Sequence, residues 1–160
     1  MNATGTQWLA LKNAFVAAAH TLWDSDQAVQ IVFGQPGYPV PDDIVAITDG
    51  TTEQQPGPMG GRRLRDEDLT QDVVISIWRP GGQEMEKVAA ERADELLRQL
   101  EHQVRHTDTT LGGVVEWCFL TSVRHEGTPQ ELTGDGRLCQ LTVTFTARAR
   151  ISSTTPVEFS

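Results

Sequence analysis

Histidines and carboxylates are the residues of this chain whose types and spacing could do chemistry. His102 and His106 lie four residues apart in a helical pattern, a spacing that can turn two imidazoles toward one metal ion. The only further ligand nearby in the sequence is Asp108. Two solvated histidines near the C-terminal end of a helix, where the dipole tolerates positive charge, are the simpler explanation. The sequence therefore predicts no metal site here.

Two acidic runs, at residues 42–43 and 66–68, could hold a divalent ion or act as an acid–base pair. Both lie at the expected edges of strands, where solvated turn carboxylates explain them more simply. The stretch at residues 57–62 is rich in glycine but lacks the Gly-Lys-Ser/Thr ending and the helix start that phosphate binding requires. The nucleophile-elbow, zinc-protease and dinucleotide motifs are also missing. We therefore expect neither enzymatic activity nor a bound cofactor.

The two cysteines, Cys118 and Cys139, both lie in strand-like patterns. A disulfide scaffold needs more cysteines, and structural zinc needs a closely spaced cluster. Alternation places Cys118 on the opposite face of its strand from Trp117, and Cys139 on the apolar face of the last strand. The two thiols would then not point at each other, which disfavours a disulfide. We expect two small buried side chains.

Length and charge limit the possible classes of protein. The 160 residues fit one domain, and a net charge of -9 argues against broad binding to a phosphate backbone. The longest purely apolar stretch, residues 15–19, is far shorter than a membrane span. No basic residue precedes an apolar run at the N-terminus, so no signal peptide is predicted. We expect a cytoplasmic protein without membrane or sequence-specific nucleic-acid partners.

Apolar spacing predicts two helices and five strands. Leu11 and Phe15 recur at helical spacing in residues 6–23, for which Thr6 is the expected N-cap. The apolar stripe of residues 84–106 is the clearest helical pattern in the chain. The last strand alternates strictly, which indicates one buried and one polar face. The expected strands are residues 29–33, 44–48, 72–78, 114–123 and 138–151.

This order of elements predicts an α+β fold. We expect a two-layer sandwich, with two helices packed on one face of a mostly antiparallel sheet of about five strands. The last two strands should form an antiparallel hairpin. The expected organisation is a single domain over residues 1–160, with its core at 6–151 and a loose tail at 152–160.

Residues 49–68 are the least regular stretch, with several glycines and prolines and no apolar period. We predict a mobile arm between two paired strands. Its mixed charges suit docking to a protein surface, although a flexible solvated loop explains them equally well. The half-polar face of residues 72–78 and the Thr-rich polar face of the last strand could meet another subunit, water or the bore of a ring. The candidate interface residues are Arg62, Arg63, Arg65, Asp66, Glu67, Asp68, Trp78, Arg148 and Arg150.

The chain resembles the tail terminator (tail completion) proteins of long-tailed bacteriophages. Four stretches carry the resemblance, which covers residues 6–151 and includes no diagnostic motif. They are the helix end Ala17-Ala18-Ala19-His20-Thr21-Leu22-Trp23, the polar arm before Asp72-Val73-Val74-Ile75-Ser76-Ile77-Trp78, the helix Ala89-Ala90-Glu91-Arg92-Ala93-Asp94-Glu95-Leu96-Leu97, and the strand pair at 114–123 and 138–151.

The resemblance implies a homo-oligomeric ring, commonly a hexamer, that caps the finished tail tube at its head-proximal end. Such a ring stops tube polymerisation and provides a docking face for the head connector. The implied partners are copies of the chain, the major tail tube protein and the connector protein. The resemblance assigns no role to any individual residue.

Other functions stay open at this stage. We hypothesise that the arm meets the charged face of the second helix, with Arg92, Arg98 and Arg105, across subunits. A head-side neck (stopper) or head-completion protein would have the same composition. A small-ligand-binding α+β domain would instead have a pocket lined by tryptophans, such as Trp23, Trp78 or Trp117.

Overall fold

The computed structural model describes residues 5–26, 28–35, 43–56 and 64–152 of the chain. These residues form two α-helices, α1 (Trp8–Trp23) and α2 (Glu84–His102). α2 continues into a π-helical turn, η1 (Gln103–Thr107), and a short 3-10 turn, η2 (Gln130–Leu132), precedes the last strand. The strands are β1 (Val29–Phe33), β2 (Asp43–Pro56), β3 (Leu64–Arg79), β4 (Trp117–Glu126) and β5 (Arg137–Ser152).

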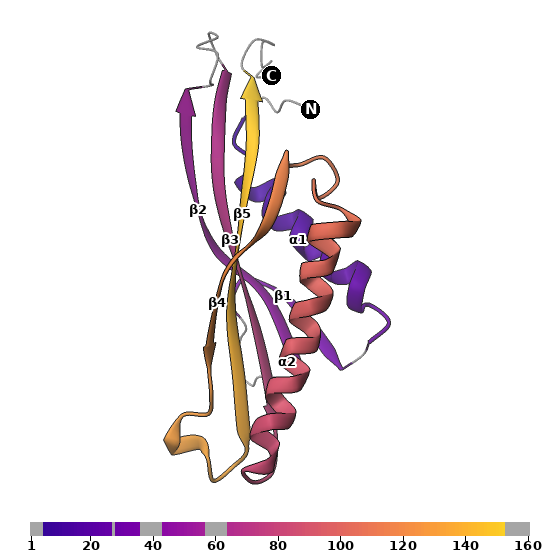
Figure 1. Ribbon diagram of the computed structural model, residues 1–160, viewed down its shortest axis with the longest axis vertical. Helices are drawn as coiled ribbons and strands as arrows, with labels where there is room; N and C mark the ends of the chain where they lie inside the picture. The colour runs from indigo at the N-terminus through magenta and orange to yellow at the C-terminus, as the bar shows by residue number, and fades with distance from the viewer. Residues whose placement is uncertain (1–4, 27, 36–42, 57–63, 153–160) are drawn as a thin grey trace.

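The strands form one sheet in the order β1-β2-β3-β5-β4. β1 runs parallel to β2, and the other three neighbouring pairs are antiparallel. α1 and α2 lie on the same face of the sheet, which we call the helix face (Figure 1). The opposite face, which we call the outer face, carries neither helix. The predicted two-layer α+β fold and the hairpin of the last two strands are confirmed.

The core lies between the helices and the sheet. Val73, Ile75 and Ile77 project from β3 to the helix face and have no exposed surface. Phe15 of α1 meets Phe145 of β5 with the ring centroids 5.0 Å apart. Each large apolar side chain buried in this way stabilises the fold by roughly 1.5–3 kcal/mol. The alternation of β3 and β5 therefore decides which face of the sheet the helices cover.

A buried ionic network joins α2 to the sheet. Asp43, at the start of β2, is 1% exposed and accepts hydrogen bonds from Arg79 of β3 and Arg92 of α2. Arg92 also lies 2.7 Å from a carboxylate oxygen of Asp26, which precedes β1. Burial alone would lower the pKa of Arg92, but the hydrogen bonds to Asp26 and Asp43 raise it overall. The buried carboxylate of Asp43 is therefore compensated by two guanidinium groups.

Residues 49–68, predicted as an irregular arm, are mostly strand, and that expectation is corrected. β2 continues to Pro56, β3 begins at Leu64, and the two strands pair along this stretch. The side chains here are largely threonine, glutamine and carboxylate, so no apolar alternation marks the strands in the sequence. Backbone pairing needs no apolar side chains, and it extends beyond the part of the sheet that buries a core. Residues 57–63 lie outside the described residues, and mobility of this stretch stays a prediction.

The buried face of β4 is also corrected. We expected Cys118 and Cys139 to lie on different faces, but both lie on the helix face. Cys118 is 2% exposed, whereas Phe119 on the outer face is 48% exposed. Four apolar residues, from Trp117 to Leu120, follow one another here, so alternation gave no guide to the inward face. Cys118 and Cys139 are both free and buried. Residues 153–160, most of the predicted loose tail, lie outside the described residues.

Candidate assembly interface

Two ion pairs join β3 to β5 on the outer face. Asp66 lies directly opposite Arg150, and Asp68 directly opposite Arg148. The Nε of Arg150 is 3.1 Å from Asp66 Oδ1, and the Nε of Arg148 is 2.9 Å from Asp68 Oδ1. Opposite charges at directly paired positions support the pairing of antiparallel strands. Four of the predicted interface residues are thus brought together, and their charges are balanced within the chain.

Arg148 also connects this ladder to an aromatic pair at the β4 side. Its guanidinium carbon lies 5.7 Å from the ring centroid of Trp117, within the range of a cation–π contact. Trp117 stacks on Phe119 with the centroids 4.7 Å apart and the planes 9° from parallel. The hydrogen bond to Asp68 raises the pKa of Arg148. The outer face therefore ends at β4 in an exposed aromatic surface.

Rows of hydroxyl groups cross the outer face beside the ion pairs. The hydroxyls of Thr51 on β2 and Thr70 on β3 are 2.7 Å apart. Those of Thr121 on β4 and Thr146 on β5 are 2.9 Å apart. The polar side of the last strand is thus on the outer face, as the alternation predicted. A face with its polar groups already bonded can meet water or another chain without a large desolvation cost.

Glu67 has a different environment from its acidic neighbours. It lies on the helix face with no exposed surface. Its carboxylate accepts the backbone N–H of Gln7 at 2.6 Å and the side-chain amide of Gln54 at 3.0 Å. Gln7, not Thr6, is the N-cap of α1, and its own side chain makes no capping hydrogen bond. Glu67 therefore caps α1 from β3, and its burial leaves no surface for an outside partner.

The other predicted interface residues are spread over the molecule. Trp78 is half-buried on the outer face, where it packs so closely on Gly136 that a Cβ there would lie 2.5 Å from Trp78 Cζ2. Arg65 is exposed near the start of β3. Arg62 and Arg63 lie outside the described residues. The site role of these four residues stays a prediction.

The three arginines of the second helix pattern all have partners within the chain. Arg92 is 18% exposed and belongs to the buried network described above. Arg98 pairs with Asp94 at 2.6 Å, and Arg105 of η1 pairs with Glu101 at 3.8 Å, both at the surface. We had hypothesised that this helix face contacts the arm of another subunit. Arg92 is not available for such a contact, because its guanidinium group pairs with Asp26 and Asp43 of the same chain.

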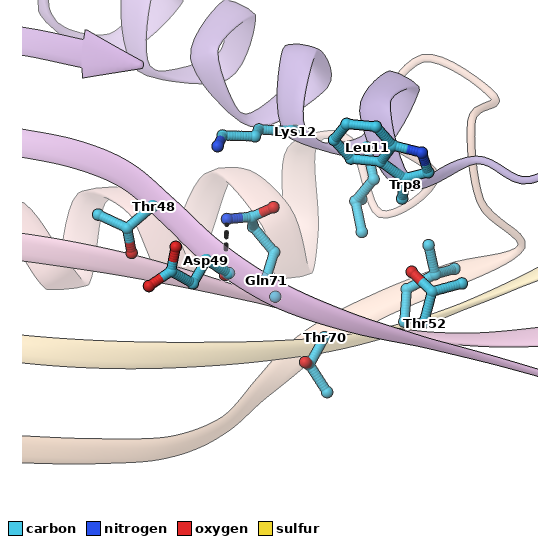
Figure 2. A pocket seen from close by; sticks show the side chains of 10 residues that line it. Trp8, Leu11, Lys12, Thr48, Asp49, Thr52, Thr70 and Gln71 are labelled. Atoms are coloured by element: carbon cyan, nitrogen blue, oxygen red, sulfur yellow. Dashed lines mark hydrogen bonds between the residues drawn. The ribbon is translucent and has the colours of Figure 1, made fainter. Parts of the chain in front are cut away.

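A hollow of about 260 Å³ lies between α1 and the upper part of β2. Figure 2 shows Trp8 and Lys12 of α1 on one side of it and Gln71 of β3 across from them. Gln71 donates its amide to the backbone oxygen of Asp49 at 3.1 Å. Trp8 is 52% exposed, so this tryptophan, which the sequence reading did not single out, leaves an apolar surface beside β2.

A second hollow, of about 510 Å³, lies between the end of α2 and β4. Val104 and Arg105 of η1 line one side, and Trp117 and Phe119 line the other. Trp23, Trp78 and Trp117 were the tryptophans expected to line a ligand pocket. Of these three, only Trp117 lines one of these two hollows. Trp23 is buried and donates its indole N–H to Gln99 at 2.6 Å.

His102 and His106, the candidate metal ligands, lie next to each other at the end of α2 and in η1. The rings of His102 and His106 are exposed, with centroids 5.0 Å apart. In the parts of the chain that the structure describes, no group of three or more His, Cys, Asp or Glu side chains is placed to hold a metal ion. None of the described helices is long and apolar enough to cross a membrane.

Comparison with known proteins gives a structural match only. No protein-family model matches the chain, and no curated protein is similar to it in sequence. Among solved structures, the chain is similar to a chain described as "Virion of native gene transfer agent (GTA) particle". The identity is 11%, the TM-score is 0.44, and the match covers 88% of this chain and 94% of that chain.

Proposed function

We propose that the chain is a structural protein of a phage-like virion and acts as a tail terminator. Copies assemble in the host cytoplasm and close into a ring at the head-proximal end of the tail tube. The ring stops tube polymerisation and offers a docking face to the head connector. The work of such a protein is recognition of other chains, and none of its steps needs a catalytic group.

The observation that carries this proposal is the projecting end of the sheet. β2, β3 and β5 run past both helices at the upper end of the molecule in Figure 1. The β2 side chains at residues 49–55 are all exposed there. The outer face at this end carries the paired charges of Asp66–Arg150 and Asp68–Arg148. A neighbouring chain can therefore cover these four side chains without burying an unpaired charge, which would be costly.

The oligomeric state is the first test. We expect size-exclusion chromatography with light scattering to show a closed oligomer, alone or after the major tail tube protein is added. A strict monomer at high protein concentration under both conditions would rule out the ring.

The second test separates this function from that of a head-side neck or stopper protein. Tail tube protein is allowed to polymerise with and without the chain, and tube growth is followed by light scattering and electron microscopy. A terminator should stop growth when present at far fewer copies than the tube protein and should be found at tube ends. Binding to isolated heads, with tubes growing unhindered, would favour the neck protein instead.

A further inference from the structure

The sheet has one open edge on each side. β1 pairs with β2 only from Asp43 to Ile47, and the exposed residues 49–55 of β2 extend beyond it. On the other side β4 is the last strand in the order, and its residues 121–126 are exposed. Within the described chain, both stretches present backbone N–H and C=O groups with no neighbouring strand, which is a template for pairing with another chain.

Each edge carries only part of the usual protection against such pairing. Residues 49–55 and 117–126 contain neither lysine nor proline, although each edge strand has one β-bulge and a few charged side chains. β4 instead exposes two large apolar side chains, Phe119 at 48% and Val123 at 39%. An open edge with exposed apolar side chains favours association with another chain.

We propose that the open edge of β2 pairs with β4 of a second copy, so that the copies join head to tail through a continuous sheet. The proposal rests on the ring function and assigns the contact that builds the ring. Because two different edges meet, the contact is heterologous, and a heterologous contact that closes gives a ring.

Strand direction is compatible with this contact. β2 and β5 are both antiparallel to β3, so they run the same way, and β4 runs opposite to β5. β4 therefore runs opposite to β2. When two copies stand side by side in the same orientation, β4 of one meets β2 of the next as an antiparallel pair, in which the helix faces and the outer faces continue across the contact.

The side chains on each face fit this continuation. Val123 lies on the helix face, since it is directly opposite Val143 of the core. Thr52 is level with Cys118 of its own chain, so Val123 of one copy meets Thr52 of the next when the two copies are offset along the strands by the span from Cys118 to Val123. The hollow lined by Trp8 can then take the apolar side chain of Val123. On the outer face, the basic Arg124 of β4 would lie near the acidic Glu53 of β2. Opposite charges at facing or diagonal positions favour this pairing.

Chemical cross-linking tests the contact directly. The double variant Gln54→Cys/Val123→Cys is treated with a short bis-maleimide and run on a denaturing gel. The native thiols of Cys118 and Cys139 are buried, and burial raises the pKa of Cys118 to about 12, so they should not compete. We expect a ladder of linked dimers, trimers and higher multimers. Each single variant alone should give no ladder, because β2 meets β4 and not another β2.

A matched pair of lysine variants provides the second measurement. Val123→Lys places a charge on the β4 edge and should convert the oligomer to monomer. Val88→Lys changes a valine of nearly equal exposure, 41% against 39%, on α2 away from both edges. This control should keep the oligomer, and both variants should keep the circular dichroism spectrum of the parent.

The outcomes separate the two proposals. An oligomer that persists in Val123→Lys, or that yields no ladder from the double variant, overturns the edge contact and leaves the ring function standing. A ladder from either single variant also overturns it, since the contact would then be between identical edges. A parent protein that is monomeric with and without tube protein defeats the ring function itself.

Discussion

Glu67 is the residue whose role changes most between sequence and structure. In the sequence it stands in an acidic run beside three arginines, which suggested a charged docking surface. In the structure it is buried and accepts the backbone N–H of Gln7, the N-cap of α1, from a strand 60 positions along the chain. A carboxylate at this place complements the positive end of the helix dipole.

Glu67→Gln should therefore weaken the protein through α1. The substitution keeps the shape and removes the negative charge, so we expect a loss of about 1 kcal/mol in the free energy of unfolding. Urea denaturation followed by circular dichroism measures it. Glu131→Gln in η2, where the side chain is exposed, is the control and should leave the midpoint nearly unchanged. Equal midpoints for the two variants would contradict the capping role.

Arg92 is the second residue that serves the interior. It compensates Asp43 together with Arg79 and also binds Asp26. Arg92→Leu leaves the carboxylate of Asp43 buried with one cation fewer, and we expect a loss of about 3 kcal/mol in unfolding free energy.

The matched control for this variant is Arg98→Leu on the same helix. Arg98 pairs with Asp94 at the surface, where its side chain is 78% exposed. Exposed ion pairs contribute little, so this variant should unfold at nearly the parent midpoint. Chemical denaturation of both variants gives the comparison. A similar loss of unfolding free energy in Arg92→Leu and Arg98→Leu would show that the Asp43 network stabilises the protein no more than an exposed ion pair does.

At the scale of elements, the turn into β5 depends on a close contact with the end of β3. A Cβ at Gly136 would lie 2.5 Å from Trp78 Cζ2 and 2.7 Å from the carbonyl oxygen of Arg79. Both positions are too close for real Cβ contacts. The absence of a side chain at Gly136 lets the ring of Trp78 lie against the backbone.

Gly136→Ala should accordingly destabilise the protein by about 1–3 kcal/mol, because the added methyl group forces Trp78 or the turn to move. Gly134→Ala is the matched control, since nothing lies within 4 Å of a Cβ at that position. It should be neutral or slightly stabilising, because alanine reduces the freedom of the unfolded chain. Thermal unfolding distinguishes the two, and a neutral Gly136→Ala would contradict the packing described here.

At the scale of the whole molecule, burial within the fold makes the thiols of Cys118 and Cys139 unreactive. Burial raises the pKa of Cys118 to about 12, and burial together with the nearby Glu86 raises the pKa of Cys139. At neutral pH both thiols are protonated and covered, and a protonated thiol is a poor nucleophile. Reaction with an aromatic disulfide reagent should therefore be slow in the native protein and should speed up on unfolding.

The test is a time course of thiol release with and without denaturant. Val88→Cys supplies an exposed thiol as an internal reference, and it should react at once. Rapid reaction of the parent protein under native conditions would show that the sheet opens locally at β4 or β5.

The fold could be predicted from the sequence where one face of an element is buried. The period of α2 and the strict alternation of β5 both require a single apolar side, and both were found where the pattern placed them. The long upper parts of β2 and β3 could not be found in this way. They are held by backbone pairing and by polar contacts such as Thr51–Thr70, which leave no apolar period.

The candidate interface was predicted in part for the same reason. Charge type identified Asp66, Asp68, Arg148 and Arg150, but only the strand register shows that they pair with each other. Trp8 was not identified, because an aromatic residue in a helical stripe looks like core until the edge of the helix is known. In the structure it is 52% exposed, at the start of α1 and beside the part of β2 that does not pair with β1.

The sequence by itself determined the class of the fold, the two helices and the polar side of the last strand, because local periodicity reports which side chains meet the core. Only the tertiary structure decided which charges remain for other chains. Register and strand order bring together residues far apart in sequence, so that Glu67 is used inside, the Asp66 and Asp68 pairs are neutralised, and two strand edges stay open. Such long-range pairing leaves no mark in a local pattern, and the proposed assembly surface depends on it.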